Sequence, residues 1–236
     1  MRSMIRIAVP EHAGPSLISV FYRRGPSPDY DAAHHAFLHA WDQHTNFRDV
    51  SLTISHEDHP GQDIGALQDT CRGHAAEPWL VWLGAHARPL HDGWLDRLTA
   101  AMDDLTVGMA AVCGSHEVNP HLRTSAFAVR PALVGGLYPE PVETRRDCYI
   151  FEHGARNFTI RLRDADWRTV VVGRVGVFDF GDWERSGTYR VGEQENLLVA
   201  DRATDEWANA TPPLRDLLYR YCWQSAEFPT HPDESF

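Results

Sequence analysis

Two adjacent side chains, Glu152 and His153, offer acid–base chemistry. A carboxylate can take the proton of an attacking hydroxyl group, and an imidazole, whose unperturbed pKa is about 6.5, suits the same task. We expect Glu152 to be the general base and His153 to be its close competitor. The structural alternative is that Glu152 only caps the helix expected to follow it.

Arginine supplies all 22 residues counted as lysine plus arginine. A guanidinium group forks onto phosphate oxygens, so an arginine at the end of a strand could hold a diphosphate without a metal ion. Arg23, Arg24 and Arg88 lie in loops that follow predicted strands and are the candidates. For each, the alternative is a surface arginine paired with one of the 33 acidic residues.

Strand and helix patterns surround these residues. Apolar runs predict strands over residues 17–22, 50–54, 79–83, 107–112 and 170–172. Helical spacing predicts helices in the segments between these strands and over residues 214–222. The 79–83 run ends abruptly in Gly84, which predicts a buried strand opening into a crevice, where ligands of open α/β sheets sit.

The segment from Trp79 to Leu95 resembles the central strand and metal-site turn of inverting, family-2-like glycosyltransferases of the A fold. The sequences of these enzymes have, in order, an apolar strand, Asp-x-Asp, x-x-Pro and Gly-Trp-Leu. Here Pro89 matches the proline, and residues 93–95 match Gly-Trp-Leu. Gly84 and His86 stand in place of the two aspartates. The resemblance implies an α/β fold: a single Rossmann-like domain with a mostly parallel central sheet flanked by helices.

The implied domain covers residues 1–228, with a nucleotide-sugar half (17–112), an acceptor half (113–228) and a disordered tail (229–236). A second match supports it. Family members carry an acidic pair, then a helix with Arg-Leu, a glycine, an aromatic residue and arginine. Here Glu152-His153 precedes residues 161–168 in that order, with Asp166 in place of the glycine.

The resemblance also assigns binding roles. Residues expected to contact the nucleotide sugar are Tyr22, Arg23, Glu57, Asp58, Asp63, Gly65, Gly84, His86 and Arg88. Residues expected on the acceptor side are Trp94, Ser125 and Arg130. A solvated acidic turn is the alternative for residues 57–58, and an edge strand leading into a helix is the alternative for residues 123–133.

The implied metal is Mn²⁺ or Mg²⁺. An unusual site could combine His86 with Asp179 or Asp182, which lie about where A-fold enzymes place a ligand after the last strand. His35 and His39, four residues apart on a predicted helix, could also share an ion. We expect these two to be surface histidines, because no third ligand follows on that helix.

The implied activity moves a monosaccharide from a nucleotide-diphosphate sugar to an acceptor hydroxyl with inversion. The acceptor could be a small molecule, a glycan, a protein or a modified nucleobase. Because the aspartate pair is missing, a second hypothesis is a catalytically inactive module that binds sugar nucleotides or glycans. A third is a metal-dependent hydrolase built on the 14 histidines.

Composition argues against several other classes. The chain has no run of about eighteen apolar residues and no signal-peptide pattern, so we expect a cytoplasmic protein without a membrane span. A net charge of −11 provides no general attraction for nucleic acid. Motifs of P-loop, dinucleotide-binding and serine-hydrolase enzymes are missing.

The four scattered cysteines are expected to be reduced and mostly buried. The oligomeric state is not predicted.

Overall fold

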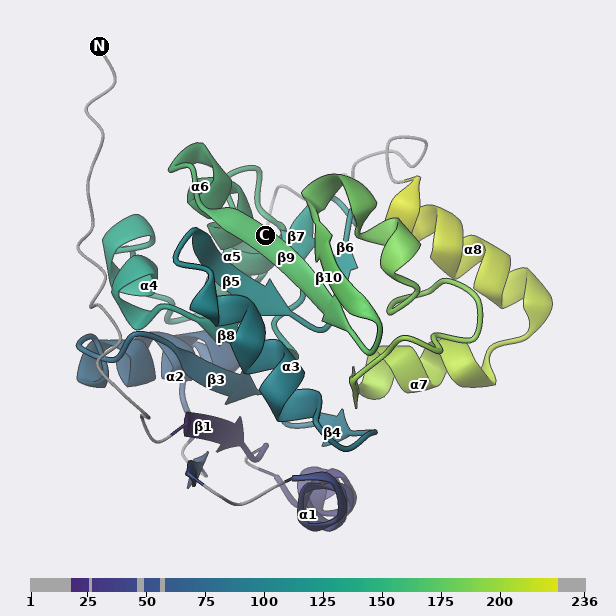
Figure 1. Cartoon of the computed structure of the whole chain (residues 1–236), viewed down its shortest axis with the longest axis horizontal. Helices are drawn as coiled ribbons and strands as arrows, with labels where there is room; N and C mark the ends of the chain where they lie inside the picture. The colour runs from purple at the N-terminus through teal and green to yellow at the C-terminus, as the bar shows by residue number, and fades with distance from the viewer. Residues whose placement is uncertain (1–17, 26, 46–48, 56–57, 225–236) are drawn as a thin grey trace.

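A seven-stranded sheet forms the centre of the computed structural model, which describes residues 18–25, 27–45, 49–55 and 58–224 (Figure 1). Its order is β10-β9-β5-β8-β3-β1-β2. The strands are β1 (Ile18–Arg23), β2 (Val50–Ser55), β3 (Leu80–Leu83), β5 (Val107–Ala111), β8 (Ala126–Val129), β9 (Arg168–Gly173) and β10 (Gly176–Asp179). The predicted tail, residues 229–236, lies outside the described residues.

Most strands of this sheet run in one direction. β1 is parallel to β2 and β3, while β8 is antiparallel to both of its neighbours, β3 and β5. β5 therefore runs with β3, β9 is parallel to β5, and β10 returns antiparallel to β9. The predicted mostly parallel sheet is confirmed. The edge-strand alternative for residues 123–133 is wrong, because β8 lies at the centre of the sheet.

Two short strand pairs lie outside the main sheet. β4 (Arg88–Pro89) pairs with β11 (Val199–Ala200), and β6 (Gly114–Ser115) pairs with β7 (His121–Leu122), both antiparallel. The β6–β7 pair forms where the chain leaves β5 and before it enters β8. It therefore folds over the edge of the sheet at which the parallel strands end.

Helices cover both faces of the sheet. They are α1 (Asp31–His44), α2 (Gln62–Gly73), α3 (Trp94–Ala100), α4 (Pro131–Leu137), α5 (Arg145–His153), α6 (Phe158–Asp164), α7 (Arg202–Asn209) and α8 (Pro212–Trp223). α2, α4, α5 and α6 pack on one another, and α3 packs on β5, β8 and β9. Figure 1 shows α3 in front of the sheet and α2 behind it. In the part of the chain that is described, no helix is both long and apolar enough to cross a membrane.

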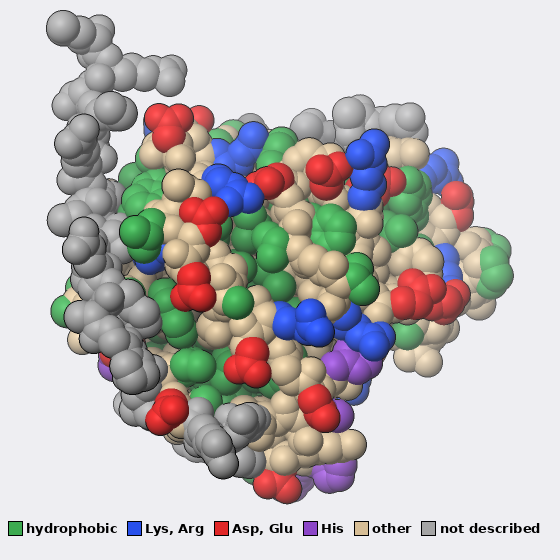
Figure 2. All heavy atoms as spheres, in the orientation of Figure 1, with side chains coloured by type: hydrophobic (Ala, Val, Ile, Leu, Met, Phe, Trp, Pro, Cys, Tyr) green, Lys and Arg blue, Asp and Glu red, His purple; other side chains and the backbone are tan. Residues whose placement is uncertain are grey.

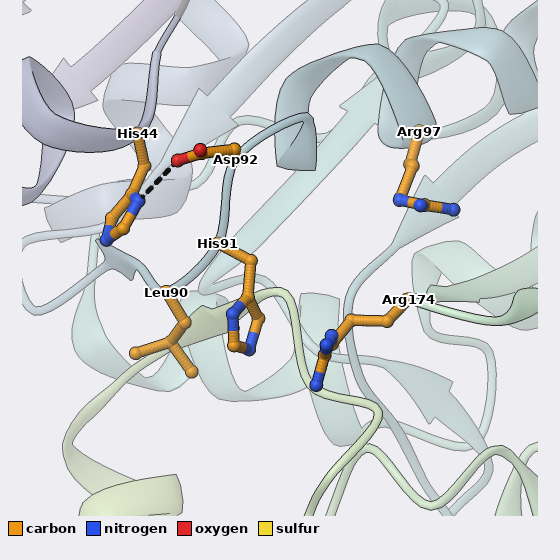
Figure 3. A pocket seen from close by; sticks show the side chains of 6 residues that line it. All are labelled: His44, Leu90, His91, Asp92, Arg97 and Arg174. Atoms are coloured by element: carbon orange, nitrogen blue, oxygen red, sulfur yellow. Dashed lines mark hydrogen bonds and ion pairs between the residues drawn. The ribbon is translucent and has the colours of Figure 1, made fainter.

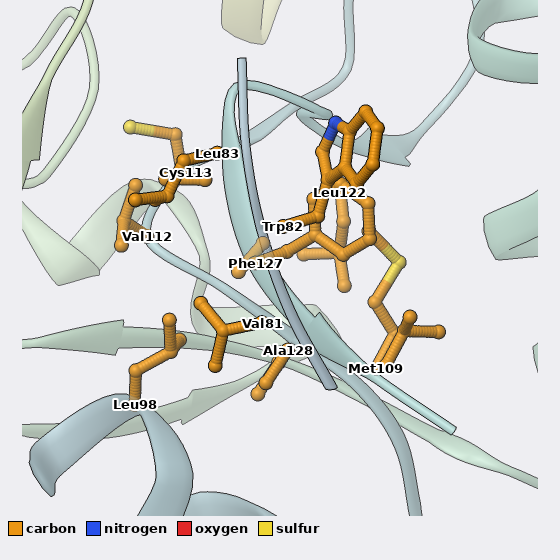
Figure 4. Packing of buried hydrophobic residues seen from close by; sticks show 14 of the residues in the cluster. Val81, Trp82, Leu83, Leu98, Met109, Val112, Cys113, Leu122, Phe127 and Ala128 are labelled. Atoms are coloured by element: carbon orange, nitrogen blue, oxygen red, sulfur yellow. The ribbon is translucent and has the colours of Figure 1, made fainter. Parts of the chain in front are cut away.

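The core is built on the three central strands. Every residue of β3, β5 and β8 is buried, as expected for strands covered on both faces. Side chains alternate between the faces: Val81 lies on the side of Leu98 from α3, and Trp82 lies with Phe127 on the other side (Figure 4). All four cysteines are free, and all but Cys148 are fully buried.

Candidate functional site

The edge at which the parallel strands end gathers several predicted site residues. β1 ends at Arg23, and Gly84 directly follows β3. Ser125 precedes the antiparallel strand β8 and therefore reaches the same edge, where its carbonyl accepts a hydrogen bond of 2.8 Å from the Gly84 N–H. α2 begins at this edge and carries Asp63 in its first turn. The turn after the tryptophan-rich strand is thus lined by residues from four segments.

An ion pair joins Arg23 to Asp63. Arg23 Nη1 lies 2.8 Å from Asp63 Oδ1, and the Arg23 side chain is 2% exposed while that of Asp63 is 46% exposed. Burial raises the pKa of Asp63, Arg23 opposes that shift, and the negative charge of Glu152 adds to it while His86 lowers it. Glu152 and His86 therefore lie within the range of a charge–charge interaction with Asp63.

Glu152 and His153 end helix α5. The helix begins with a capping box between Thr144 and Asp147 and ends at Gly154. The Thr124 N–H donates a hydrogen bond of 3.2 Å to Glu152 Oε1. Helix α6 is capped by the Asn157 side chain. The helix-cap alternative for Glu152 is therefore wrong, and its carboxylate faces the strand segment that leads into β8.

His121 lies beside this pair and was not selected from the sequence. It is fully buried on β7, and its ring centroid lies 4.3 Å from that of His153. Its Nδ1 lies 2.8 Å from the Asn119 carbonyl oxygen. Burial is the main cause that lowers the pKa of His121 to about 3, so the ring is neutral at pH 7. One ligand atom each from His121, Glu152 and His153 lie within 4.8 Å of one another.

Arg123, which begins the 123–133 segment, forms a largely buried ion pair with Asp201 beside Glu152, and neither was named as a site residue from the sequence. Arg123 Nη2 lies 3.2 Å from Asp201 Oδ2, and its guanidinium lies 4.5 Å from the centre of the Tyr189 ring. Burial by itself would raise the pKa of Glu152, but His153, Arg123 and the Thr124 N–H lower it below the ordinary value. Glu152 is therefore ionised at neutral pH. The pairing of β6 with β7 and the hydrogen bond from Asn119 to the His153 carbonyl oxygen place residues 119–123 beside α5.

Two residues predicted on the acceptor side lie elsewhere. Arg130 is 1% exposed and follows β8, which runs against its neighbours, so it lies at the opposite edge of the sheet. Its guanidinium donates to the carbonyl oxygens of Val107 and Met102, at 2.8 and 2.9 Å. Trp94 is fully buried, and its Nε1–H donates to Thr45 Oγ1 at 3.2 Å. Both are structural residues, and these two predictions are wrong.

Two residues predicted to contact the nucleotide are enclosed by protein. Tyr22 is 1% exposed, and its hydroxyl donates to the Ala85 carbonyl at 3.1 Å. A Cβ atom on Gly65 would lie 2.2 Å from the His59 ring and 2.7 Å from the Val142 carbonyl oxygen. The space that this glycine leaves is therefore filled by the protein itself. Tyr22 supports the turn after β3 through its hydrogen bond to the Ala85 carbonyl. Gly65 lets α2 pack closely against His59 and Val142.

The metal site predicted around His86 is not assembled. Asp179 pairs in register with Val170 and lies 2.9 Å from the guanidinium of Arg168, which begins β9. Because β10 runs antiparallel, Asp179 lies at the edge opposite His86. Asp182 lies 2.9 Å from Arg185. The prediction that Asp179 shares an ion with His86 is wrong for this topological reason.

The remaining candidates lie at the periphery. Arg24 pairs with Asp31, and Arg88 lies 2.9 Å from Asp205 on α7, as the surface alternative predicts. Asp58 is exposed. Glu57 lies outside the residues that the structure describes.

Two surface clefts lie away from Glu152. One, of about 500 Å³, is lined by Arg202, Asp205, Glu206 and Asn209 of α7. The other, of about 360 Å³, is lined by His44, Leu90, His91, Asp92, Arg97 and Arg174 (Figure 3). On the face in Figure 2, basic side chains gather beside histidines in the region between α3 and the β9–β10 turn. The side chains of Asp63 and Glu152, 46% and 22% exposed, open to solvent outside both clefts.

No protein-family model and no curated protein matches this chain.

Proposed function

We propose that this chain is an A-fold-like glycosyltransferase that transfers a monosaccharide from a nucleotide-diphosphate sugar to an acceptor hydroxyl with inversion. The observation that carries the proposal is the convergence of Arg23–Asp63, the Gly84 turn, Ser125 and Glu152 at one edge of a mostly parallel sheet. Open α/β sheets bind ligands outside the carboxyl ends of their strands. The proposal also rests on the resemblance of residues 79–95 to the central strand and turn of this family.

Glu152 is the proposed general base. It is ionised and partly exposed. An acceptor hydroxyl beside it can pass its proton to Oε2, the oxygen that does not accept from Thr124 and that lies 3.7 Å from His153 Nε2, as it attacks the anomeric carbon. The new bond joins the acceptor oxygen to that carbon. The bond from the carbon to the diphosphate oxygen breaks, and its electron pair leaves with the nucleoside diphosphate. The Glu152 carboxylate therefore takes the proton of the acceptor hydroxyl, and the nucleoside diphosphate takes the negative charge of the broken bond.

Positive side chains of the protein are proposed to stabilise the leaving diphosphate. Arg23 and Arg123 lie at this edge, and a guanidinium group can donate two hydrogen bonds to phosphate. The residues in place of the Asp-x-Asp pair, Gly84 and His86, do not fit Mn²⁺ or Mg²⁺. A hard cation takes oxygen ligands, and the nearby carboxylate of Asp63 is already paired with Arg23. No step of the proposed reaction uses a metal ion.

The test is donor binding and turnover with a panel of nucleotide sugars. Calorimetry should find at least one donor that binds, and incubation with it should release free nucleoside diphosphate. Glu152→Gln should leave donor affinity unchanged and lower turnover about 100-fold, the usual scale for loss of a general base. Glu143→Gln, an exposed glutamate before α5, is the matched control and should retain full turnover.

A second candidate function is a binding module without catalysis. The observation that favours it is the Gly84-Ala85-His86 turn, which offers no carboxylate where the resembled enzymes have two. Donor binding without release of nucleotide by the unaltered protein would establish the module. If no donor binds, the transferase and a module that binds sugar nucleotides are both rejected.

A further inference from the structure

We propose that His121, Glu152 and His153 form a binding site for one divalent transition-metal ion of the Zn²⁺ type. Within the described part of the chain, these three residues are the group whose possible ligand atoms lie within 4.8 Å of one another. They come from β7 and from the last turn of α5, which pack together. This inference does not depend on the proposed glycosyl transfer.

His121 is oriented as a metal ligand. Its Nδ1 faces the Asn119 carbonyl oxygen at 2.8 Å, and a carbonyl only accepts, so Nδ1 must carry the hydrogen. Nε2 then presents a lone pair. The side chain is fully buried, and Nε2 has no hydrogen-bond partner among the described residues. A buried lone pair without a donor is costly to the fold, and a bound cation would satisfy it.

Asn119 orients the His121 ring and holds the end of helix α5, which carries His153. Its backbone carbonyl fixes the His121 ring, and its side-chain amide donates to the His153 carbonyl oxygen at 2.7 Å. The ring of Tyr149 stacks on His153 with 4.9 Å between centroids. Hydrogen bonds that orient histidine rings from behind are a regular feature of metal sites. The cluster therefore has a supporting layer as well as ligand atoms.

Two imidazoles and one carboxylate suit zinc, copper or iron better than magnesium or calcium. Metal–nitrogen bonds are about 2.0–2.1 Å long, so the three ligand atoms must move closer together when an ion binds. The partly exposed side chains of Glu152 and His153 allow that adjustment and leave a position for water. The positive charge of Arg123 lies nearby, but Asp201 pairs with it at 3.2 Å.

A metal ion in this site would oppose the transfer proposed above. It would occupy the Glu152 oxygen that has to accept the proton of the acceptor. We therefore expect the ion to inhibit transfer rather than to support it. Metal binding and donor binding are separate measurements, so failure of one proposal is distinguishable from failure of the other.

The test is calorimetry with Zn²⁺ alone on protein first freed of metal with a chelator. The unaltered chain should bind one equivalent with the highest affinity. Glu152→Gln, which preserves shape, and His121→Gln should each weaken that equivalent at least about tenfold, because even supporting residues of metal sites contribute that much. Circular dichroism should show that both variants fold. Co²⁺ should give the visible absorption of a site with nitrogen ligands, and the variants should lose it.

His35 and His39 provide the control. They are exposed and four residues apart on α1, so they are the most obvious competing site for the ion. A His35→Ala/His39→Ala variant should keep the tight equivalent. The proposal is overturned if this control variant loses it, if Glu152→Gln binds as the unaltered protein does, or if the unaltered protein binds no ion tightly.

Discussion

Replacing Asp63 by asparagine should destabilise the protein more than replacing its deeply buried partner, Arg23, by methionine. Breaking a buried ion pair leaves an uncompensated charge and costs about 3–5 kcal/mol. Asp63 is 46% exposed, so water screens the pair and we reduce the expected loss for Asp63→Asn to about 2 kcal/mol. The stranded group would be the Arg23 guanidinium, whose Nε already has no hydrogen-bond partner in the described structure.

Arg23→Met removes that buried charge and leaves a carboxylate that can turn to solvent. Because the remaining Asp63 carboxylate is 46% exposed and can be hydrated, the expected change is within about 1 kcal/mol. Asp63→Asn in the Arg23→Met background should then cost almost nothing, which gives a coupling energy of about 2 kcal/mol. Arg24→Met is the matched control at a partly exposed ion pair and should change stability by less than about 1 kcal/mol.

Urea unfolding followed by tryptophan fluorescence measures these differences by linear extrapolation. Equal losses in the two single variants, or no coupling between them, would refute the claim that burial of Arg23 depends on Asp63. Because Arg23→Met should stay folded, its affinity for a nucleotide sugar also reports whether this guanidinium contacts the diphosphate. A weakened donor affinity in a stable variant would assign that contact.

Three further outcomes are expected. Arg130→Met should lower the free energy of unfolding by about 3–5 kcal/mol, because it leaves buried carbonyl acceptors unpaired, with donor affinity unchanged. Gly84→Ala should change the free energy of unfolding by less than about 1 kcal/mol, since the new Cβ would lie no closer than 3.5 Å to any atom beyond the two adjacent residues. Gly65→Ala should cost about 1–3 kcal/mol, because its Cβ would lie 2.2 Å from the His59 ring. The pKa of Glu152 is lowered, so its carboxylate stays ionised until the pH falls below the ordinary glutamate pKa of about 4.3. The fall of kcat/KM on the acid side should therefore lie below that pH. A fall near pH 6.5 would instead assign the proton transfer to an imidazole.

Most of the elements could be predicted because their signals are local. The apolar run before Gly84 is a strand with every residue buried, and Phe37 and Trp41 face the core from one side of α1. Arg23 ends β1 and Gly84 follows β3, and the expectation of a mostly parallel sheet places both residues at the edge where these strands end. Glu152 was selected because Glu152-His153 resembles the acidic pair of the family, and the structure brings it within range of a charge–charge interaction with Asp63.

The positions of Arg130, Asp179 and His121 required the tertiary structure. Sequence order and side-chain period do not say that β8 runs against β3, and reversal of that strand carries Ser125 to the site and Arg130 away from it. The same is true of β10, whose antiparallel return takes Asp179 to the far edge. His121 lies on a two-residue strand, which is too short to give a periodic signal in the sequence. The pairing of this strand with β6 brings it to Glu152.

Local patterns were sufficient to predict strands and helices, their apolar faces and the turns that carry polar groups, because these features depend on spacings of two to four residues along the chain. The tertiary structure decided which turns share an edge and which charges meet there. Strand order and direction depend on hydrogen bonds between segments far apart in the chain, and a local pattern is the same whichever way its strand points. For this reason the acid–base pair of α5 was visible in the sequence, while the buried histidine and the arginine beside it were not.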